Sequence, residues 1–518
     1  MKLIISLDSG TTSARAVLFN EDGECVAIEQ KEFTQIFPES GWVEHDPNEI
    51  LESQMEVLED LLKREEARNA EIVGMGITNQ RETVVVWDRA TGKPVYNAIV
   101  WQDRRTVEAC QELRASGLSN YCKLVTGLVI DPYFSGTKLS WVLDNVDGAR
   151  ERAERGELCF GTVDSWLLWN LTGGKVHATD VSNASRTLMF NIRTLEWDDG
   201  MLRALNVPAA LLPEVKESGS VFGEYVTRDF GNVPIAAIMG DQQSALFGQT
   251  CFTPGTAKNT YGTGCFMLMN TGSAIPDSPS GLLNTIAWQV GGKVVYALEG
   301  SVFVAGAAMQ WLRDGLEILE DVGESSTISA RHADSHGDSN VVVVPAFSGL
   351  GTPYWDMNAR GAVFGLTHDS SREALIRATL ESLAFQSMDV LQSMQEDSGI
   401  SLFTLQVDGG ASANEYLMQF QSDLLGVSIE RPVVVESTAA GVAFMAAHVL
   451  GLKSLPEIKC MREVGKVFMP EKSVVWREGR KKVWNDAVRR VRTVSGESSK
   501  EADLDADTDK DADTDMDR

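Results

Sequence analysis

Short apolar runs separated by polar turns recur along most of the chain, and they predict alternating strands and helices. The first run covers 3–7 and is followed, after small polar residues at 8–13, by a second run at 14–19. Apolar runs this short and rich in branched residues are typical of buried strands, and small polar residues between them are typical of a turn. We therefore expect the chain to begin with a strand–turn–strand hairpin.

The same arrangement returns near the middle of the chain. The segment 256–259 leads into a Gly/Thr-rich turn at 260–265 and then into an apolar run at 266–269. Two such hairpins, each opening one half of the chain, predict an α/β protein with two similar domains that face one nucleotide.

A third glycine-rich segment, 408–414, lies between a predicted strand at 402–407 and a predicted helix at 415–425. Backbone N–H groups at the start of a helix can bind a phosphate group. This segment is therefore a further candidate for contact with a nucleotide.

Helices are predicted where apolar residues recur every three or four positions. Asp46 has the place of an N-cap and Pro47 that of the first helical residue. Further helices are expected over 164–171, ended by two glycines, and from residue 438, where small residues permit close packing on a sheet. For the helix that follows Pro47 the predicted buried stripe is Leu51, Met55, Leu58 and Leu62.

His332 and His336 have the spacing of two metal ligands. They lie in a segment rich in Ser, Asp and Gly and lack the glutamate of an H-E-x-x-H motif. We expect a polar loop there rather than a metal site.

The formal net charge of −28 over 518 residues argues against nucleic acid or an anionic membrane as a partner. Part of this charge lies in 497–518, whose low-complexity acidic sequence predicts a disordered tail. The seven cysteines show no C-x-x-C pair, and no apolar run is long enough for a membrane span. These features predict a cytoplasmic protein without membrane insertion.

Candidate chemistry is concentrated at the ends of the predicted strands, but each segment by itself has two interpretations. The turn at 8–13 is either an ordinary polar turn or a phosphate-binding loop whose Asp8 reaches a hydrated Mg²⁺. Arg81 and Glu82 form either a solvated ion pair or a clamp for vicinal hydroxyls. Trp101 is either a core residue or a platform for a small ligand, and Asp241 either an N-cap or a general base.

Taken together, the motifs resemble the FGGY family of carbohydrate kinases, and within it the members that phosphorylate glycerol. The resemblance extends from residue 3 to about residue 465. The segments that carry it are 8–13, 77–83, 97–102, 131–138, 240–243 and 258–266.

The resemblance implies a two-domain, actin-like (ribonuclease H-like) fold with the active site in the interdomain cleft. The implied domains are 1–250 and 251–465, followed by a helical extension at 466–496 and the acidic tail at 497–518. The implied cofactors are ATP and Mg²⁺, and a homo-oligomer, dimer or tetramer, is the implied assembly.

The resemblance also implies roles for individual residues. Asp241 is the expected general base and Asp8 is expected to act near the metal ion. The expected glycerol-binding residues are Arg81, Glu82, Trp101, Tyr133, Asp241, Gln242 and Phe266. The expected nucleotide-binding residues are Thr11, Thr12, Ser13, Arg15, Thr263, Gly306, Gln310, Gly410 and Asn414.

Three positions depart from the family pattern. Ser9 stands beside the first turn where a glutamine is usual, and Ala374 stands where a polar residue is usual. The segment 227–232 lacks the basic, glycine-rich loop through which some bacterial members bind fructose 1,6-bisphosphate, and it has no histidine. We therefore do not expect this regulation.

Two other functions fit the same motifs. A related sugar or polyol kinase would keep the nucleotide loops and change the acceptor pocket. An actin-like ATPase switch would share the fold and have no acceptor. The small pocket with an aromatic floor, formed by Arg81, Glu82, Trp101 and Phe266, favours a three-carbon acceptor over a larger sugar. A switch would need an interaction module or a polymerising surface, and only the acidic tail is spare for one.

Overall fold

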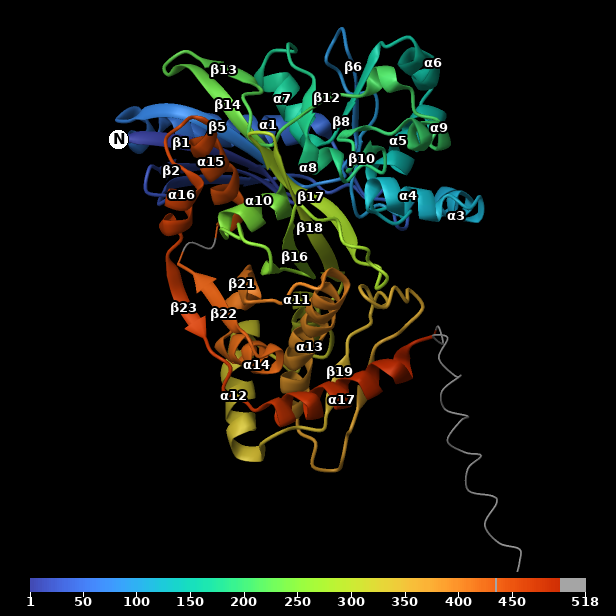
Figure 1. The fold of residues 1–518 in the computed structure, drawn as a ribbon, viewed down its shortest axis with the longest axis vertical. Helices are drawn as coiled ribbons and strands as arrows, with labels where there is room; N and C mark the ends of the chain where they lie inside the picture. The colour runs from blue at the N-terminus through green and yellow to red at the C-terminus, as the bar shows by residue number, and fades with distance from the viewer. Residues whose placement is uncertain (434–435, 494–518) are drawn as a thin grey trace, which may run out of the picture.

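The computed structural model describes residues 1–433 and 436–493, which form two lobes (Figure 1). The first lobe is built on a six-stranded sheet in which β1 and β2 form an antiparallel hairpin and β1, β5 and β14 run parallel. The strand order is β13 (Gly223–Thr227), β14 (Gly231–Gly240), β5 (Glu71–Asn79), β1 (Lys2–Ser9), β2 (Ser13–Asn20) and β3 (Cys25–Glu32).

The second lobe repeats this topology. Its β15 and β16 form the antiparallel hairpin, and β15, β21 and β22 run parallel. The strand order is β17 (Leu283–Val290), β18 (Lys293–Val302), β16 (Cys265–Gly272), β15 (Thr256–Tyr261), β21 (Thr404–Asp408), β22 (Ser428–Pro432) and β23 (Val464–Phe468). The duplicated topology confirms the predicted two-domain, actin-like α/β fold.

Both predicted hairpins are present, and each ends in a tight turn. In the first, Ser9 pairs with Ala14, and the Gly10 N–H donates to the Ser13 carbonyl over 3.0 Å. In the second, Tyr261 pairs with Cys265, and the Gly262 N–H donates to the Gly264 carbonyl over 2.8 Å. The loops expected to contact nucleotide therefore occupy equivalent places in the two sheets.

Helix α1 (Pro47–Lys63) begins as predicted, with the Asp46 carboxylate accepting the Asn48 N–H over 2.8 Å. Its buried face is wider than the predicted stripe and is centred on Ile50, Leu58 and Leu61. Because a helix lying flat on a sheet buries a broad face, the stripe prediction was wrong in detail. Of its members only Leu58 is fully buried, while Leu51, Met55 and Leu62 lie half-buried at the rim.

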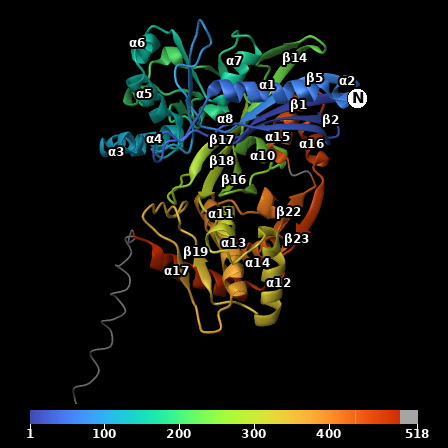
Figure 2. The same ribbon diagram turned by 180° about the vertical axis from the view of Figure 1, so that it is seen from behind.

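Helix α15 (Ser437–Val449), although late in the sequence, packs on β1, β5 and β14 of the first lobe. Figures 1 and 2 show it in orange-red beside the blue strands. It crosses α10 (Asp241–Gly248), and the small residues predicted for this helix explain how closely it approaches. A Cβ atom on Gly441 would lie 1.8 Å from the Ser244 carbonyl oxygen.

The core of the second lobe surrounds the long helix α13 (Arg372–Ser398). Helix α17 (Val474–Val491) docks on it through Trp484, whose indole N–H donates to Asp389 over 2.6 Å. The predicted helix at 415–425 is α14 (Glu415–Leu425). The predicted tail, 497–518, lies outside the described residues.

His332 and His336 lie on helix α12 (Ser325–His336), so the expected loop was wrong. Ser and Asp residues are only mildly unfavourable in a helix, and packing against α13 and α14 overrides their preference. The two imidazole rings stack with centroids 4.4 Å apart. Among the described residues no group of three or more His, Cys, Asp or Glu could hold a metal ion.

None of the helices in the described ranges combines the length and the apolar character needed to cross a bilayer.

The remaining elements complete the two lobes. In the first lobe they are β4 (Glu44–His45), α2 (Glu65–Arg68), β6 (Val85–Asp88), β7 (Ala98–Ile99), α3 (Val107–Ala115), α4 (Ser119–Thr126), α5 (Ser135–Asn145), α6 (Ala149–Glu154), β8 (Leu158–Gly161), α7 (Val163–Leu171), β9 (Ala178–Asp180), α8 (Val181–Ala184), β10 (Phe190–Asn191), β11 (Glu196–Trp197), α9 (Asp199–Ala204) and β12 (Glu214–Lys216). In the second lobe they are α11 (Gly306–Gln310), β19 (Val342–Val344) and β20 (Ala362–Phe364). Helix α16 (Leu455–Met461) follows α15 and lies with it against the first lobe, where Ile458 shares a core cluster with Val17 and Phe19 (Figure 1).

Candidate active site

A cleft of about 730 Å³ opens where the two lobes meet. Asp8, Thr260 and Asp408 enter it from the ends of β1, β15 and β21, and Asp241 enters it from the start of α10. Parallel strands of an α/β sheet deliver side chains to one edge, so the duplicated topology brings both sets of strand ends to this cleft. The lining residues are Asp8, Gly10, Arg15, Asp241, Thr260, Asp408, Gly409, Gly410, Ser412, Ala413, Arg431, Pro432, Val433, Glu436, Ser437 and Thr438.

The first turn is held in place by side chains from its own lobe. The Thr11 hydroxyl accepts the Trp101 indole N–H over 3.0 Å, and the Ser13 hydroxyl accepts the Gln30 amide over 3.2 Å. At the cleft, Arg15 forms an ion pair of 2.7 Å with Glu436. Trp101, which is expected to bind the acceptor, therefore contacts the first turn, which is expected to bind nucleotide.

The second turn lies against the start of α11. The backbone N–H groups of Ala305 and Ala307 donate to the Thr263 carbonyl, and that of Gly306 donates to the Gly262 carbonyl, over 2.9 to 3.2 Å. Gln310 ends the same helix. These predicted nucleotide residues form a second group that is not part of the cleft lining.

The third loop approaches the second hairpin closely. Gly409 has a φ of +81°, and a Cβ atom there would lie 2.4 Å from the Tyr261 carbonyl oxygen. The predicted residue Gly410 lines the cleft. The predicted residue Asn414 caps α14 by accepting the Leu417 N–H over 3.0 Å, so its side chain already has a structural role.

Asp8 and Asp241 both provide carboxylate oxygens to the lining of the cleft. Burial raises the pKa of Asp8 to about 7, although Arg15 lowers it, because the ionised carboxylate lacks full compensation. A hydrated Mg²⁺ would supply that missing positive charge, and carboxylates are ligands that it prefers. The residues present therefore fit the expected metal ion.

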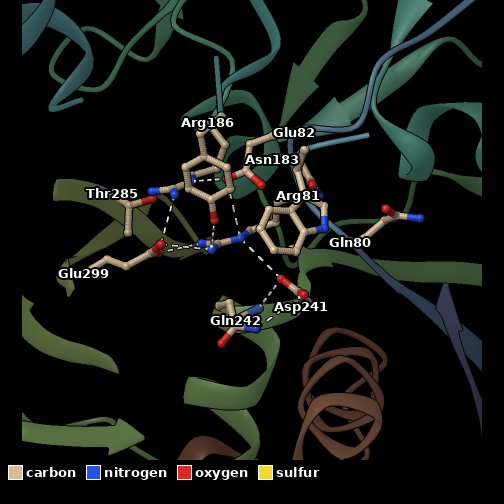
Figure 3. Close-up of polar contacts among 12 residues, drawn as sticks. Gln80, Arg81, Glu82, Asn183, Arg186, Asp241, Gln242, Thr285 and Glu299 are labelled. Atoms are coloured by element: carbon tan, nitrogen blue, oxygen red, sulfur yellow. Dashed lines mark hydrogen bonds and ion pairs between the residues drawn. The ribbon is translucent and has the colours of Figure 1, made fainter. Parts of the chain in front are cut away.

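Several residues expected to bind the acceptor lie in a buried cluster of charged groups centred on Arg81 (Figure 3). The Arg81 Nε atom lies 3.3 Å from Asp241 and 3.7 Å from Glu82. Its Nη2 atom donates to the Tyr133 hydroxyl over 3.2 Å, and its Nη1 atom to Gln243 over 3.2 Å. The adjacent Arg81 and Glu82 are therefore not a solvated ion pair, because both side chains are only 2% exposed.

Sequence reasoning missed two members of this cluster, Glu299 on β18 and Arg186 after α8. Glu299 accepts from both arginines, and Arg186 also donates to Glu82 over 2.6 Å. One signal was present in the sequence: a single carboxylate in the apolar run 294–302 has to be paired if that run is a buried strand.

Three predicted aromatic residues meet beside the cluster. The rings of Trp101 and Tyr133 lie 5.6 Å apart, and those of Trp101 and Phe266 lie 6.1 Å apart, both edge to face. They come from the two lobes, since Phe266 is on β16. The predicted aromatic floor is therefore assembled only by the tertiary structure.

Asp241 is the most accessible carboxylate of the group, with a side-chain exposure of 28%. Its Oδ1 atom accepts the Gln242 N–H over 2.7 Å. The Gln242 amide oxygen in turn accepts from the buried Lys258, which also donates to Thr260 over 2.8 Å. Lys258 was not predicted, and burial lowers the pKa of its ammonium group.

The structure places the three departures from the family pattern, which are Ser9, Ala374 and the segment 227–232. The Ser9 hydroxyl is buried and has no hydrogen-bond partner among the described residues. Ala374 is buried in the first turn of α13. The segment 227–232 forms the tight exposed turn between β13 and β14.

Comparison with known proteins agrees with this architecture. Residues 3–248 match the N-terminal domain, and residues 257–450 the C-terminal domain, of the FGGY family of carbohydrate kinases. The chain is 56% identical to a glycerol kinase of Carboxydothermus hydrogenoformans, with 95% of this chain and 98% of that protein covered. It is 58% identical to a glycerol kinase of Halalkalibacterium halodurans, with 94% and 98% covered.

Solved structures share the fold over nearly the whole chain. The glycerol kinase of Plasmodium falciparum with ADP superposes with a TM-score of 0.90 at 36% identity, covering 96% of this chain and 99% of that chain. A ligand-bound xylulose kinase of Lactobacillus acidophilus superposes with a TM-score of 0.84 at 21% identity, covering 95% and 98%, and shows the likeness of fold alone. On the matched domains and the full-length relatives, the chain belongs to the FGGY family of carbohydrate kinases.

Proposed function

We propose that this protein transfers the γ-phosphoryl group of ATP to a terminal hydroxyl of glycerol, giving sn-glycerol 3-phosphate and ADP. The observation that carries the proposal is that Asp241, in contact with Arg81, lines the same cleft as the nucleotide loops at Gly10 and Gly410. The names of the full-length relatives, which are glycerol kinases, support the same acceptor.

A primary hydroxyl is a poor nucleophile, so its proton has to be accepted as the new bond forms. Asp241 is the proposed general base: it takes this proton while the hydroxyl oxygen bonds to the γ-phosphorus and the bond to the β–γ bridging oxygen breaks. Its contacts with Arg81 and with the Gln242 N–H orient the carboxylate.

The acceptor is proposed to lie between the charged cluster and the aromatic group. Arg81 and Glu82 supply a donor and an acceptor for adjacent hydroxyls, and Tyr133 and Gln242 supply further polar atoms. Trp101 and Phe266 cover the carbon chain. Buried polar groups that match one set of hydroxyls disfavour acceptors that leave them unpaired.

The nucleotide is proposed to bind along the hydroxyl- and glycine-rich turns of both lobes, with Arg15 exchanging Glu436 for a phosphate oxygen. Asp8 would hold the hydrated Mg²⁺ that neutralises charge on the phosphates. Enclosure of the cleft between two lobes excludes water, which would otherwise accept the phosphoryl group.

The location proposed for the reaction is the cytoplasm. All seven cysteines are free and five are fully buried, which suits a reducing compartment. Assembly into a dimer or tetramer stays a prediction from the resemblance.

The test is ATP turnover measured without acceptor and with glycerol, xylulose, gluconate or ribulose, with the product identified by ³¹P NMR. We expect turnover to depend on glycerol and the product to be sn-glycerol 3-phosphate. Turnover that responds to another polyol and not to glycerol would indicate a related sugar kinase. ATP hydrolysis that no acceptor changes would indicate a nucleotide switch.

A further inference from the structure

Glu299 joins the acceptor side of the site to the second lobe. It lies on β18, between the edge strand β17 and β16 of the second sheet, and its side chain is fully buried. Its Oε2 atom accepts from Arg81 Nη1 over 2.6 Å, and its Oε1 atom accepts from Arg81 Nη2 over 2.9 Å. One carboxylate of the second lobe thus binds both terminal nitrogens of an arginine of the first.

This bidentate pairing fixes the plane of the Arg81 guanidinium. With the edge formed by the two Nη atoms held by Glu299, the Nε atom faces Asp241 and Glu82. The rotation of this side chain therefore depends on a residue that does not itself line the cleft.

Arg186 extends the same restraint to the neighbouring carboxylate. Its Nη2 atom donates to Glu299 over 2.9 Å and its Nε atom donates to Glu82 over 2.6 Å. Glu82 has a φ of +63°, which is unusual for a residue other than glycine, so these contacts hold its side chain on a constrained backbone. Glu299 therefore restrains both halves of the proposed hydroxyl clamp, one directly and one through Arg186.

The charges of the cluster are compatible with this arrangement. Burial opposes ionisation of Glu299, but Arg186 and Arg81 outweigh burial and lower its pKa to about 2. The carboxylate is therefore ionised at neutral pH and compensates two buried guanidinium groups.

We propose that Glu299 is a positioning residue for the acceptor, which fixes Arg81 directly and Glu82 through Arg186 before the polyol arrives. A clamp that is already oriented does not lose side-chain freedom on binding, so it binds the acceptor more tightly. This inference rests on the proposed glycerol kinase activity. It also means that the acceptor clamp is complete only when both lobes contribute to it.

The test compares Glu299→Gln and Glu299→Asp with the wild type. Glutamine keeps the size but places an amide N–H₂ against one arginine nitrogen, so Arg81 loses the bidentate pair. We expect the KM for glycerol to rise about 10- to 100-fold, in line with the loss of one charge-assisted hydrogen bond, and the KM for ATP to stay within about twofold. Aspartate restores the charge at a shorter reach and should give an intermediate KM.

Glu381→Gln is the matched control. Glu381 on α13 is also buried between two arginines, accepting from Arg377 over 2.6 Å and from Arg480 over 2.9 Å, but neither of these arginines belongs to the Arg81 cluster. This variant should lose stability and keep the wild-type KM for glycerol.

The outcomes distinguish a failure of the positioning role of Glu299 from a failure of the proposed glycerol kinase activity. Unchanged glycerol KM in Glu299→Gln, or an equal rise in Glu381→Gln, would overturn the positioning role while leaving the proposed function intact. If Glu299→Gln does not fold, an unchanged glycerol KM in Glu299→Asp would overturn it equally. Absence of glycerol-dependent turnover in the wild type would overturn the proposed function, and the positioning role with it.

Discussion

At the residue scale, the charged groups of the site differ most in how far they are exposed. Arg81 and Glu82 are 2% exposed and Glu299 is not exposed at all, whereas Asp241 is 28% exposed. A group that exchanges protons with an incoming hydroxyl has to be reached from the cleft, and a group that only holds others does not. This contrast separates Asp241, the proposed base, from Glu299, which is proposed only to hold Arg81 and, through Arg186, Glu82.

Asp241→Asn is expected to lower kcat at least ~10²-fold, because an amide cannot accept the hydroxyl proton. Glycerol binding, measured by calorimetry, should persist, since asparagine keeps an oxygen near Arg81. Near-normal turnover would remove Asp241 from the role of base.

Arg81→Ala is expected to weaken glycerol binding about 100-fold and to leave ADP binding nearly unchanged, because the lost donors face the acceptor side. It should also reduce the free energy of unfolding by about 3 kcal/mol, since Glu299 then keeps only one arginine partner. Calorimetric titrations and urea denaturation check both effects.

Arg480→Ala serves as the control for this substitution, because Arg480 is a buried arginine paired with Glu381 in the second lobe. Its loss should destabilise the protein without changing the affinity for glycerol. An equal loss of affinity for glycerol and ADP in Arg81→Ala would mean that the acceptor pocket lies elsewhere.

At the scale of elements, the crossing of α10 and α15 decides how the late helix is held on the first sheet. Gly248 and Gly441 lie at this crossing, and a Cβ atom on Gly248 would lie 2.1 Å from the Ser437 carbonyl oxygen. Since Asp241 begins α10 and Ser437 and Thr438 at the start of α15 line the cleft, the spacing of the two helices also shapes the site.

Gly441→Ala is expected to reduce the free energy of unfolding by about 3 kcal/mol, because the added methyl group meets the backbone of α10 and the helices have to separate. Gly479→Ala is the control: a Cβ atom on this exposed residue of α17 would have nothing within 4 Å, so alanine should stabilise the helix by about 0.5–1 kcal/mol. Urea denaturation of both variants measures the difference. Equal stability of Gly441→Ala and wild type would show that α10 and α15 can accommodate the methyl group without loss of stability, against this prediction.

At the scale of the whole molecule, α17 is attached to the second lobe through a buried carboxylate. Asp389 accepts from the Trp484 indole over 2.6 Å and from the Tyr354 hydroxyl over 2.8 Å. Burial raises its pKa to about 7, although both donors lower it. We therefore expect the stability that this contact contributes to depend on pH.

The direction in which stability changes with pH follows from the protonation of Asp389 in the folded and in the unfolded protein. Between about pH 4 and pH 7 the folded protein keeps the Asp389 proton and the unfolded chain has lost it, so this group makes stability fall as pH rises through that window. Asp389→Asn removes the titration. We expect the melting temperature of the variant, relative to wild type, to rise by about 2 °C from pH 5 to pH 8, measured by calorimetry. A relative melting temperature that stays constant would contradict the raised pKa.

Much of the fold followed from local pattern. The hairpin at residues 2–20, its counterpart at 256–272 and the cap of α1 all appeared as predicted, because they depend on residues close together in sequence. The helix at 325–336 was missed because its packing partners lie far along the chain. The motifs identified candidates for the base, the clamp and the nucleotide loops, and their roles in catalysis stay predictions.

The sequence by itself determined the family, the duplicated α/β plan and the residue types at the strand ends, because each depends on residues that are close together in the sequence. Only the tertiary structure decided that Glu299 and Arg186 lie behind Arg81, and that α15 returns to the first lobe. Their partners are separated by 100 residues or more in sequence, as for Arg81 and Glu299 with a separation of 218. Contacts between residues so far apart in sequence arise from the packing of the two sheets, and no local conformational preference predicts them.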